Sequence, residues 1–267
     1  MNVTIRPQKL CGTITPPPSK SQAHRLIIAA ALADGESVLS NVAFSQDILA
    51  TLSCMEQLGA RWEKIDGSTI RVQGLAAGAP VLQKDGMPHF DCGESGSTLR
   101  FLIPIALAVA GGGVFSGRGR LMERPQKPYF DLFEEKGISW EQKDGTLTVR
   151  GTLESGTFLL PGNVSSQFFT GLLYALPLLD GASRITATTA LESESYIAMT
   201  MDALKGCGVA VDVLEDIGYY CIDNMPVSLI PRFIQLFEKS REQFDRVALV
   251  VDARSGDGFE ELCQELD

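Results

Sequence analysis

The first candidate site lies between Pro16 and Arg25, where cationic and hydroxyl side chains meet the sequence signals of a helix start. Three prolines end the preceding extended segment, and Ser19 or Ser21 can cap the helix that follows. The free amides and the positive dipole end of a helix start favour an anion. Lys20 and Arg25 add positive charge to this end, which is unfavourable in an ordinary solvated helix start. The stretch therefore predicts an anion site, with a solvated helix start as the alternative.

Two further stretches place small and hydroxyl residues before a helix. The loop Gly93-Glu-Ser-Gly96 can bring backbone amides close to a phosphate or a carboxylate. Ser165-Ser-Gln167 opens another helix with more polar groups than one cap requires. Neither is a Walker A loop, because the chain contains no Gly-Lys-Ser or Gly-Lys-Thr. The alternative for both stretches is an ordinary capped helix.

A fourth stretch, residues 119–128, carries Arg120, Arg124 and Lys127 in a proline-containing loop before a helix. The planar guanidinium of arginine suits two-pronged binding of a carboxylate or a phosphate. The stretch therefore indicates a further anion-binding element, and the alternative is a charged surface loop.

An internal repeat positions these stretches within the first 213 residues. Each copy starts at a glycine, continues into an apolar helix closed by a glycine, and in the first two copies ends in a hairpin with an Asp-Gly turn. The helices are predicted at 47–59, 128–137 and 196–206, and the hairpins at 60–74 and 138–151, with the third beginning at 209–213.

More apolar helices are predicted between the copies, at 21–32, 97–110 and 165–179. The whole indicates an α/β fold of three β-α-β-α-β-β repeats, with helices packed inward and sheets outward as one globe. The starts of the three inserted helices would then converge on one mouth and attract an anionic substrate into an otherwise acidic protein.

Composition excludes several other classes. A net charge of −10 argues against a nucleic-acid surface, and no apolar run reaches the length of a membrane span. The start of the chain does not have the pattern of a secretory signal, and the six cysteines include no CxxC pair. We therefore expect a cytoplasmic protein with no metal, no nucleic-acid partner and no membrane partner; its oligomeric state stays open.

Five motifs occur in the order and at the spacing of the enolpyruvyl transferase family, which the sequence resembles across residues 1–213: Ser19–Arg25, Gly93–Arg100, Glu123–Pro125, Val164–Phe168 and Glu192–Tyr196. The resemblance implies an inside-out α/β barrel. Lys20-Ser21, in place of the Lys-Asn pair of the UDP-N-acetylglucosamine branch, favours the branch that uses shikimate 3-phosphate. The resemblance thus implies an enzyme of aromatic amino acid biosynthesis that transfers the enolpyruvyl group of phosphoenolpyruvate to shikimate 3-phosphate and needs no cofactor.

The resemblance also implies roles for individual residues. Phosphoenolpyruvate would be held by Lys20, Gly96, Arg124 and Gln167. Shikimate 3-phosphate would be held by Ser21, Arg25, Ser165, Ser166, Gln167, Ser193 and Tyr196. Arg100 would lie behind these ligand contacts. In the family a second globe supplies the acid and base, so the catalytic residues stay unknown, and a strand within residues 1–18 would belong to that globe.

The last 54 residues, 214–267, differ in composition and hold 12 acidic against 5 basic side chains. Leu214–Pro226 and Arg246–Arg254 resemble the P-loop RNase-adaptor family of nucleotide-binding proteins, but without its Walker A loop. We predict a short α/β tail with a helix at 231–239 and a buried parallel strand at 247–251, while 218–222 could still pair with 209–213. A nucleotide-binding module and a non-catalytic fragment remain alternatives to the enzyme.

Overall fold

The computed structural model describes residues 13–75, 86–209, 220–222 and 247–249. The chain divides into two compact units, Met1–Val209 and Ala210–Asp267. In the second unit the structure describes a parallel pair of strands, β10 (Tyr220–Ile222) and β11 (Val247–Leu249). The predicted helix at 231–239 and the predicted hairpin strand at 209–213, apart from Val209, lie outside the described residues, so these two predictions and the boundary near residue 213 stay untested.

The described elements of the first unit follow the predicted repeat. In chain order they are α1 (Lys20–Leu32), β1 (Glu36–Leu39), α2 (Gln46–Gln57), β2 (Arg61–Lys64), β3 (Ile70–Gln73), β4 (His89–Asp91), α3 (Gly96–Ala110), β5 (Gly112–Ser116), α4 (Lys127–Lys136), β6 (Ser139–Lys143), β7 (Thr146–Arg150), β8 (Thr157–Leu160), α5 (Ser166–Ala175), β9 (Arg184–Ala187) and α6 (Glu194–Gly206). The run from β4 to β7 is one complete β-α-β-α-β-β unit. The described parts before and after it show α-β-α-β-β and β-α-β-α.

One prediction of helix length is wrong. The helix predicted at 165–179 ends as α5 at Ala175, and a single 3-10 turn follows at Leu176–Leu178. Pro177 is the physical reason, because it has no amide for the hydrogen bond that would continue the helix.

The sheets repeat the same pairing. The first has the strand order β1-β3-β2 and the second the order β4-β5-β7-β6, so each ends in an antiparallel hairpin. The β6–β7 hairpin turns on Asp144 and Gly145, whose φ values are 51° and 74°. Positive φ at both central residues is the geometry that Asp-Gly favours and that matches the twist of the strands. In the third sheet the described strands β8 and β9 run parallel.

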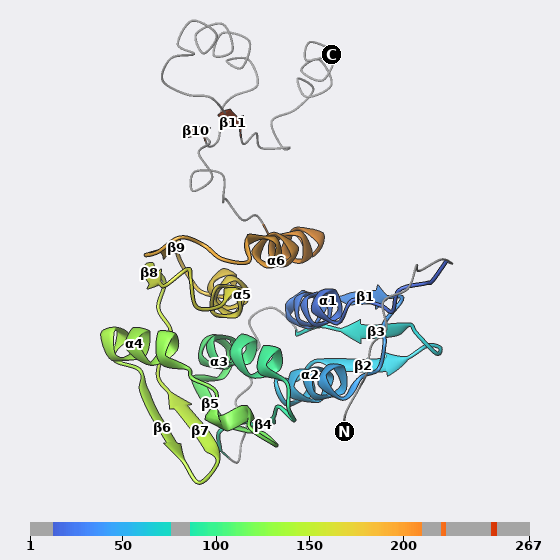
Figure 1. Ribbon diagram of the computed structural model, residues 1–267, viewed down its shortest axis with the longest axis horizontal. Helices are drawn as coiled ribbons and strands as arrows, with labels where there is room; N and C mark the ends of the chain where they lie inside the picture. The colour runs from blue at the N-terminus through green and yellow to red at the C-terminus, as the bar shows by residue number, and fades with distance from the viewer. Residues whose placement is uncertain (1–12, 76–85, 210–219, 223–246, 250–267) are drawn as a thin grey trace, which may run out of the picture. The chain divides into compact units, whose positions relative to one another are not determined.

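Helices α1, α2, α3, α5 and α6 pack on one another, the sheets lie around this group, and α4 lies against strands β6 and β8 (Figure 1). Helix α3 is the most enclosed, since its residues from Leu99 to Leu107 are buried except Arg100. It packs mainly against α5, which in turn contacts α6, while α1 contacts both α2 and α6. Helices inside and sheets outside confirm the predicted α/β class and its inside-out arrangement.

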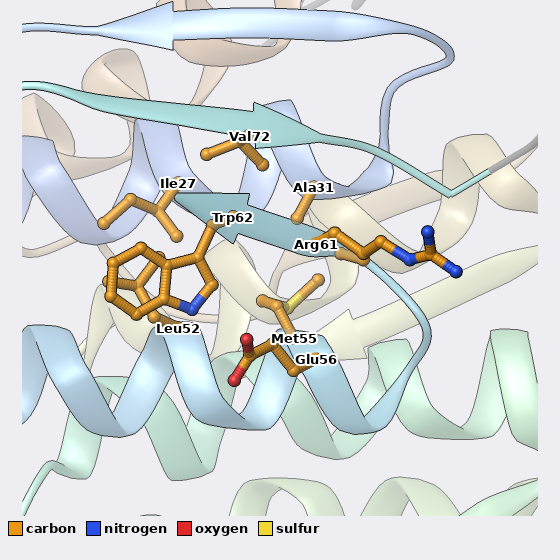
Figure 2. Close-up of a pocket in the computed structure, with 9 residues that line it drawn as sticks. Ile27, Ala31, Leu52, Met55, Glu56, Arg61, Trp62 and Val72 are labelled. Atoms are coloured by element: carbon orange, nitrogen blue, oxygen red, sulfur yellow. The ribbon is translucent and has the colours of Figure 1, made fainter. Parts of the chain in front are cut away.

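A small apolar hollow lies between α1, α2 and the first sheet (Figure 2). Its lining residues, which include Ile27, Leu52 and Val72, leave no room for a water molecule. Figure 2 shows the Trp62 ring facing the hollow from β2, whereas the Arg61 guanidinium extends away. The Trp62 Nε1 atom is buried without a hydrogen-bond partner. The predicted anion-site residues are absent from this lining, so the hollow belongs to the core.

No helix in the described part of the chain is long and apolar enough to cross a membrane.

Gly171 allows the close approach of α3 and α5. A Cβ built at this position would lie 2.6 Å from the Arg100 carbonyl oxygen and 2.8 Å from Pro104 Cγ. Both distances are below van der Waals contact, and the Tyr129 hydroxyl would lie closer still. The Arg100 carbonyl is backbone and cannot move aside cheaply.

We expect Gly171→Ala to lower the free energy of unfolding by about 1–3 kcal/mol, because the added methyl group overpacks the helix contact. Urea unfolding followed by tryptophan fluorescence measures this, since both tryptophans, Trp62 and Trp140, lie in the first unit. Gly206→Ala is the matched control: it lies in α6, and a Cβ there meets nothing within 4 Å. Equal stability of the two variants would contradict the close packing at Gly171.

Candidate anion-binding site

Helices α1, α3 and α5 each begin on a serine cap. The Oγ atoms of Ser19, Ser95 and Ser165 accept hydrogen bonds from backbone amides of the first helical turn. Each cap satisfies one of the amides that a helix start leaves without an internal partner. Of the two cap residues that the sequence allowed for α1, the structure therefore selects Ser19.

Gln167 joins the starts of α3 and α5. Its Oε1 accepts a hydrogen bond of 2.8 Å from Arg100 Nη1, and its Nε2 donates one of 2.9 Å to Ser97 Oγ. Arg100 also donates to the Pro125 carbonyl at 3.2 Å. The stretches around Gly96, Arg124 and Gln167, which are far apart in sequence, are thereby tied together.

Arg124 lies directly over Gly96. A Cβ at Gly96 would be only 2.6 Å from Arg124 Nη1, so any larger residue would displace the guanidinium. The two other cations of this loop are engaged, since Arg120 pairs with Glu123 and Lys127 pairs with Asp131. Among the described residues, the Arg124 side chain has no hydrogen-bond or ion-pair partner.

Arg25 connects α1 with three other helices although it is only 3% exposed. Its guanidinium donates to Thr200 Oγ1 at 2.8 Å, to Thr170 Oγ1 at 3.3 Å and to the Ser21 and Tyr196 carbonyls. It also lies 5.3 Å from the centre of the Phe101 ring and 5.5 Å from that of Tyr196. The predicted residues Ser21, Arg25 and Tyr196 are thus gathered in one place.

The charge of these arginines is not balanced locally. In the described residues, no carboxylate forms an ion pair with Arg25, Arg100 or Arg124. Burial lowers the pKa of the Arg25 and Arg100 guanidiniums, yet an arginine pKa lies so far above neutrality that both stay charged. Arg25 and Arg100 are withdrawn from water without a counter-charge, whereas Arg124 is exposed, and together the three cations favour an anion.

The remaining predicted residues lie nearby in different settings. The exposed Lys20 pairs with Asp47 at 2.5 Å, so its charge is offset by a neighbour from α2. Ser166 is buried at the start of α5, and the exposed Ser193 precedes α6 with a positive φ of 62°. No hydrogen bond or ion pair among the described residues links Lys20 or Ser193 to the arginines. No group of three or more potential metal ligands occurs in the described part.

A buried hydrogen-bonded chain supports the site from behind. His24 Nδ1 lies 2.7 Å from Thr51 Oγ1, which lies 2.7 Å from Thr98 Oγ1, and Thr98 bonds to Ser95 Oγ. The chain links α1, α2 and the cap of α3. Burial, more than the nearby cations Lys20 and Arg25, lowers the pKa of His24 to about 4, while Asp47 opposes this shift. The ring is therefore neutral at pH 7.

Sequence reasoning missed several of these partners: Thr51, Thr98, Phe101, Thr170 and Thr200. All five are threonines or a phenylalanine inside helices, which look like ordinary core positions. Thr170 could have been suspected, because it follows Ser166 by one helical turn on the same face. The partners on other helices carry no such local signal.

Comparison with known proteins shows which family the chain resembles. A sequence model of EPSP synthase (3-phosphoshikimate 1-carboxyvinyltransferase) matches residues 5–222. The 3-phosphoshikimate 1-carboxyvinyltransferase of Clostridium beijerinckii is 46% identical over 214 residues, covering 79% of this chain and 49% of the relative. That of Clostridioides difficile is 41% identical over 217 residues, covering 79% and 49%.

A solved structure, EPSP synthase from Acinetobacter baumannii, superposes with a TM-score of 0.62 at 23% identity, covering 76% of this chain and 45% of that one. The fold is thus that of the enolpyruvyl transferases, as the sequence motifs predicted. The chain belongs to the EPSP synthase family and spans about half the length of the curated relatives that it matches. A second model, the RapZ-like N-terminal domain, matches residues 195–267 and confirms the separate resemblance of the tail.

Protonation of His24 should weaken folding. Because the pKa in the folded protein, about 4, is below the unfolded value of 6.5, the unfolded chain binds more protons between these values. The contribution of His24 to the free energy of unfolding is therefore fully present above pH 6.5 and is lost as the pH falls toward 4. We expect the wild-type protein to lose about 1 kcal/mol more than His24→Gln between pH 7.5 and pH 5.5.

Urea unfolding at the two pH values measures this difference. His89→Gln is the matched control, because His89 is the second of the chain's two histidines and is exposed on β4. It should keep the pH dependence of the wild-type protein. The same slope in His24→Gln as in the wild-type protein would contradict the burial of a neutral His24.

Proposed function

We propose that the chain provides one face of an enolpyruvyl transferase site, which binds shikimate 3-phosphate and phosphoenolpyruvate. The reaction would move the enolpyruvyl group of phosphoenolpyruvate to the 5-hydroxyl of shikimate 3-phosphate and release phosphate. A cytoplasmic location is part of this proposal, as is the assignment of residues 1–213 to the transferase portion.

One observation supports the proposal: among the described residues, Arg25 lies buried between α1, α3, α5 and α6, Arg100 and Arg124 lie at the start of α3, and none of the three forms an ion pair with a carboxylate. Both substrates are multiply anionic, so they would supply the missing negative charge. Clustered carboxylates would be expected instead if the surface bound a cation. The curated relatives are named for the transfer of a carboxyvinyl group to 3-phosphoshikimate, which supports the first of these substrates.

Each predicted residue has a distinct part in this proposal. For phosphoenolpyruvate, Arg124 and the amide end of α3 at Gly96 would bind the anionic groups, with Lys20 released from Asp47 to join them. For shikimate 3-phosphate, Ser165, Ser166 and Gln167 would bind from the start of α5. Ser21, Arg25, Ser193 and Tyr196 would bind from α1 and α6.

The residues assigned here bind and orient substrate. They would also stabilise the charge that develops when phosphoenolpyruvate is attacked, since fixed cations and helix ends need no rearrangement for that task. The general acid and base are not assigned to residues of this chain. The tail adds no nucleotide site to the proposal, because the sequence has no phosphate-binding loop of the Walker A type.

Shikimate 3-phosphate should bind the purified chain weakly, with a dissociation constant of about 1 mM, because one face of a cleft makes only part of the contacts. Isothermal titration calorimetry measures this. Arg25→Ala should abolish the heat, since it removes the buried cation from the site. Arg61→Ala, which removes an exposed cation of β2 elsewhere, should leave the affinity within about twofold.

Tryptophan fluorescence shows whether each variant is folded before titration. No heat from a folded wild-type chain would reject binding of this substrate. Equal weakening by both substitutions would show that the chain binds anions through general charge and not through this site.

Phosphoenolpyruvate should bind against Gly96 and Arg124. In the 15N-labelled chain we expect the Gly96 and Ser97 amides to shift on titration, and Arg124→Gln to weaken the binding about tenfold through loss of a charge-assisted hydrogen bond. Arg120→Gln is the matched control from the same loop, since that guanidinium is 89% exposed and pairs with Glu123. Unchanged half-saturation in Arg124→Gln would remove this residue from the site.

A further inference from the structure

Pro104 leaves one carbonyl of α3 without its helical partner. In an α-helix the carbonyl of Arg100 would accept from the amide of residue 104, four positions later. Pro104 lies inside α3 and has no amide, and its ring also presses against that same carbonyl. A buried helix therefore carries an unsatisfied acceptor on the residue whose side chain binds Gln167.

The hydroxyl of Tyr129 takes the place of the missing amide. Tyr129 comes from α4, is fully buried, and donates to the Arg100 carbonyl at 2.8 Å. The Phe168 carbonyl lies 3.0 Å from the same hydroxyl, but Leu172 can supply its ordinary helical donor within α5. The Arg100 carbonyl has no such helical donor, so it needs the single hydroxyl proton of Tyr129. Burial raises the pKa of Tyr129 well above its usual value, so the hydroxyl keeps that proton.

The same aromatic ring supports the other end of Arg100. The Tyr129 ring meets Phe168 edge to face, with centroids 4.8 Å apart. The Arg100 guanidinium lies 4.7 Å from the centre of the Phe168 ring and continues to Gln167. Tyr129 thus contacts both the backbone of Arg100 and the ring on which its side chain rests.

We propose that Tyr129 is a positioning residue of the anion-binding site. Its hydroxyl replaces the amide absent at Pro104, fixes the backbone of Arg100, and so holds the guanidinium on Gln167. The effect on ligand binding rests on the function proposed above, whereas the effect on Arg100 is a property of the protein alone.

The test is a cycle of two substitutions in the full chain. Tyr129→Phe should weaken the binding of shikimate 3-phosphate about fivefold and should shift the Arg100 Nε–H signal in the 15N–1H spectrum, because the carbonyl is left unpaired. Pro104→Ala restores an amide at that position. In the Tyr129→Phe background it should return both the affinity and the signal to near wild-type values.

Tyr174→Phe is the matched control. Tyr174 is also buried and its hydroxyl also donates to an arginine carbonyl, that of Arg25, at 3.0 Å. That carbonyl, however, keeps the amide of Ala29 as a helical donor. We expect this variant to lose stability but to retain the Arg100 signal and the affinity within about twofold.

Two results would overturn the positioning role: an unchanged Arg100 signal in Tyr129→Phe, or a change that Pro104→Ala does not reverse. The second result would mean that the hydroxyl acts through packing or through Phe168. If the wild-type chain binds no shikimate 3-phosphate, the proposed function fails, and the Arg100 signal still decides whether Tyr129 positions this residue.

Discussion

The guanidinium of Arg25 is withdrawn from water among four helices, and no carboxylate in the described part of the chain balances its charge. Hydrogen bonds to threonine hydroxyls and to two carbonyls, together with two aromatic faces, offset only part of the cost of that burial. The helices must keep a fixed arrangement for these partners to stay in reach. Burial of the Arg25 charge without a counter-charge is unfavourable, and the binding of an anionic ligand would offset this cost.

The repeated α/β unit makes that arrangement possible. Because each unit inserts a helix whose start carries a serine cap, packing the units together brings the capped starts of α3 and α5 into contact through Gln167. The sheets outside shield the apolar faces of the helices and leave their polar starts free. Glycine allows the close approach of Arg124 to the start of α3 at Gly96 and of α3 to α5 at Gly171. A single unit could provide neither the burial nor the convergence.

Much of the fold follows from local sequence. Glycine landmarks, apolar periodicity and Asp-Gly turns were enough to predict the helices and hairpins of the first two repeats, because caps and turns act within a few residues. Pro177 shortened α5 against expectation, although proline is itself a local signal. In the site, the motif residues Arg25, Gly96, Arg124 and Gln167 could be chosen from their types and spacing. Thr200 and Phe101 could not, since their partner Arg25 lies on another helix.

The sequence by itself determined that this chain has three α/β repeats, serine-capped helix starts and an excess of cations beside those starts. Only the tertiary structure decided which cations stay without a counter-charge. Lys20, Arg120 and Lys127 pair with carboxylates, whereas Arg25, Arg100 and Arg124 do not among the described residues. It also decided that a tyrosine from α4 binds the carbonyl that Pro104 leaves open. Both outcomes depend on distances between elements far apart in the chain, and packing alone fixes those distances.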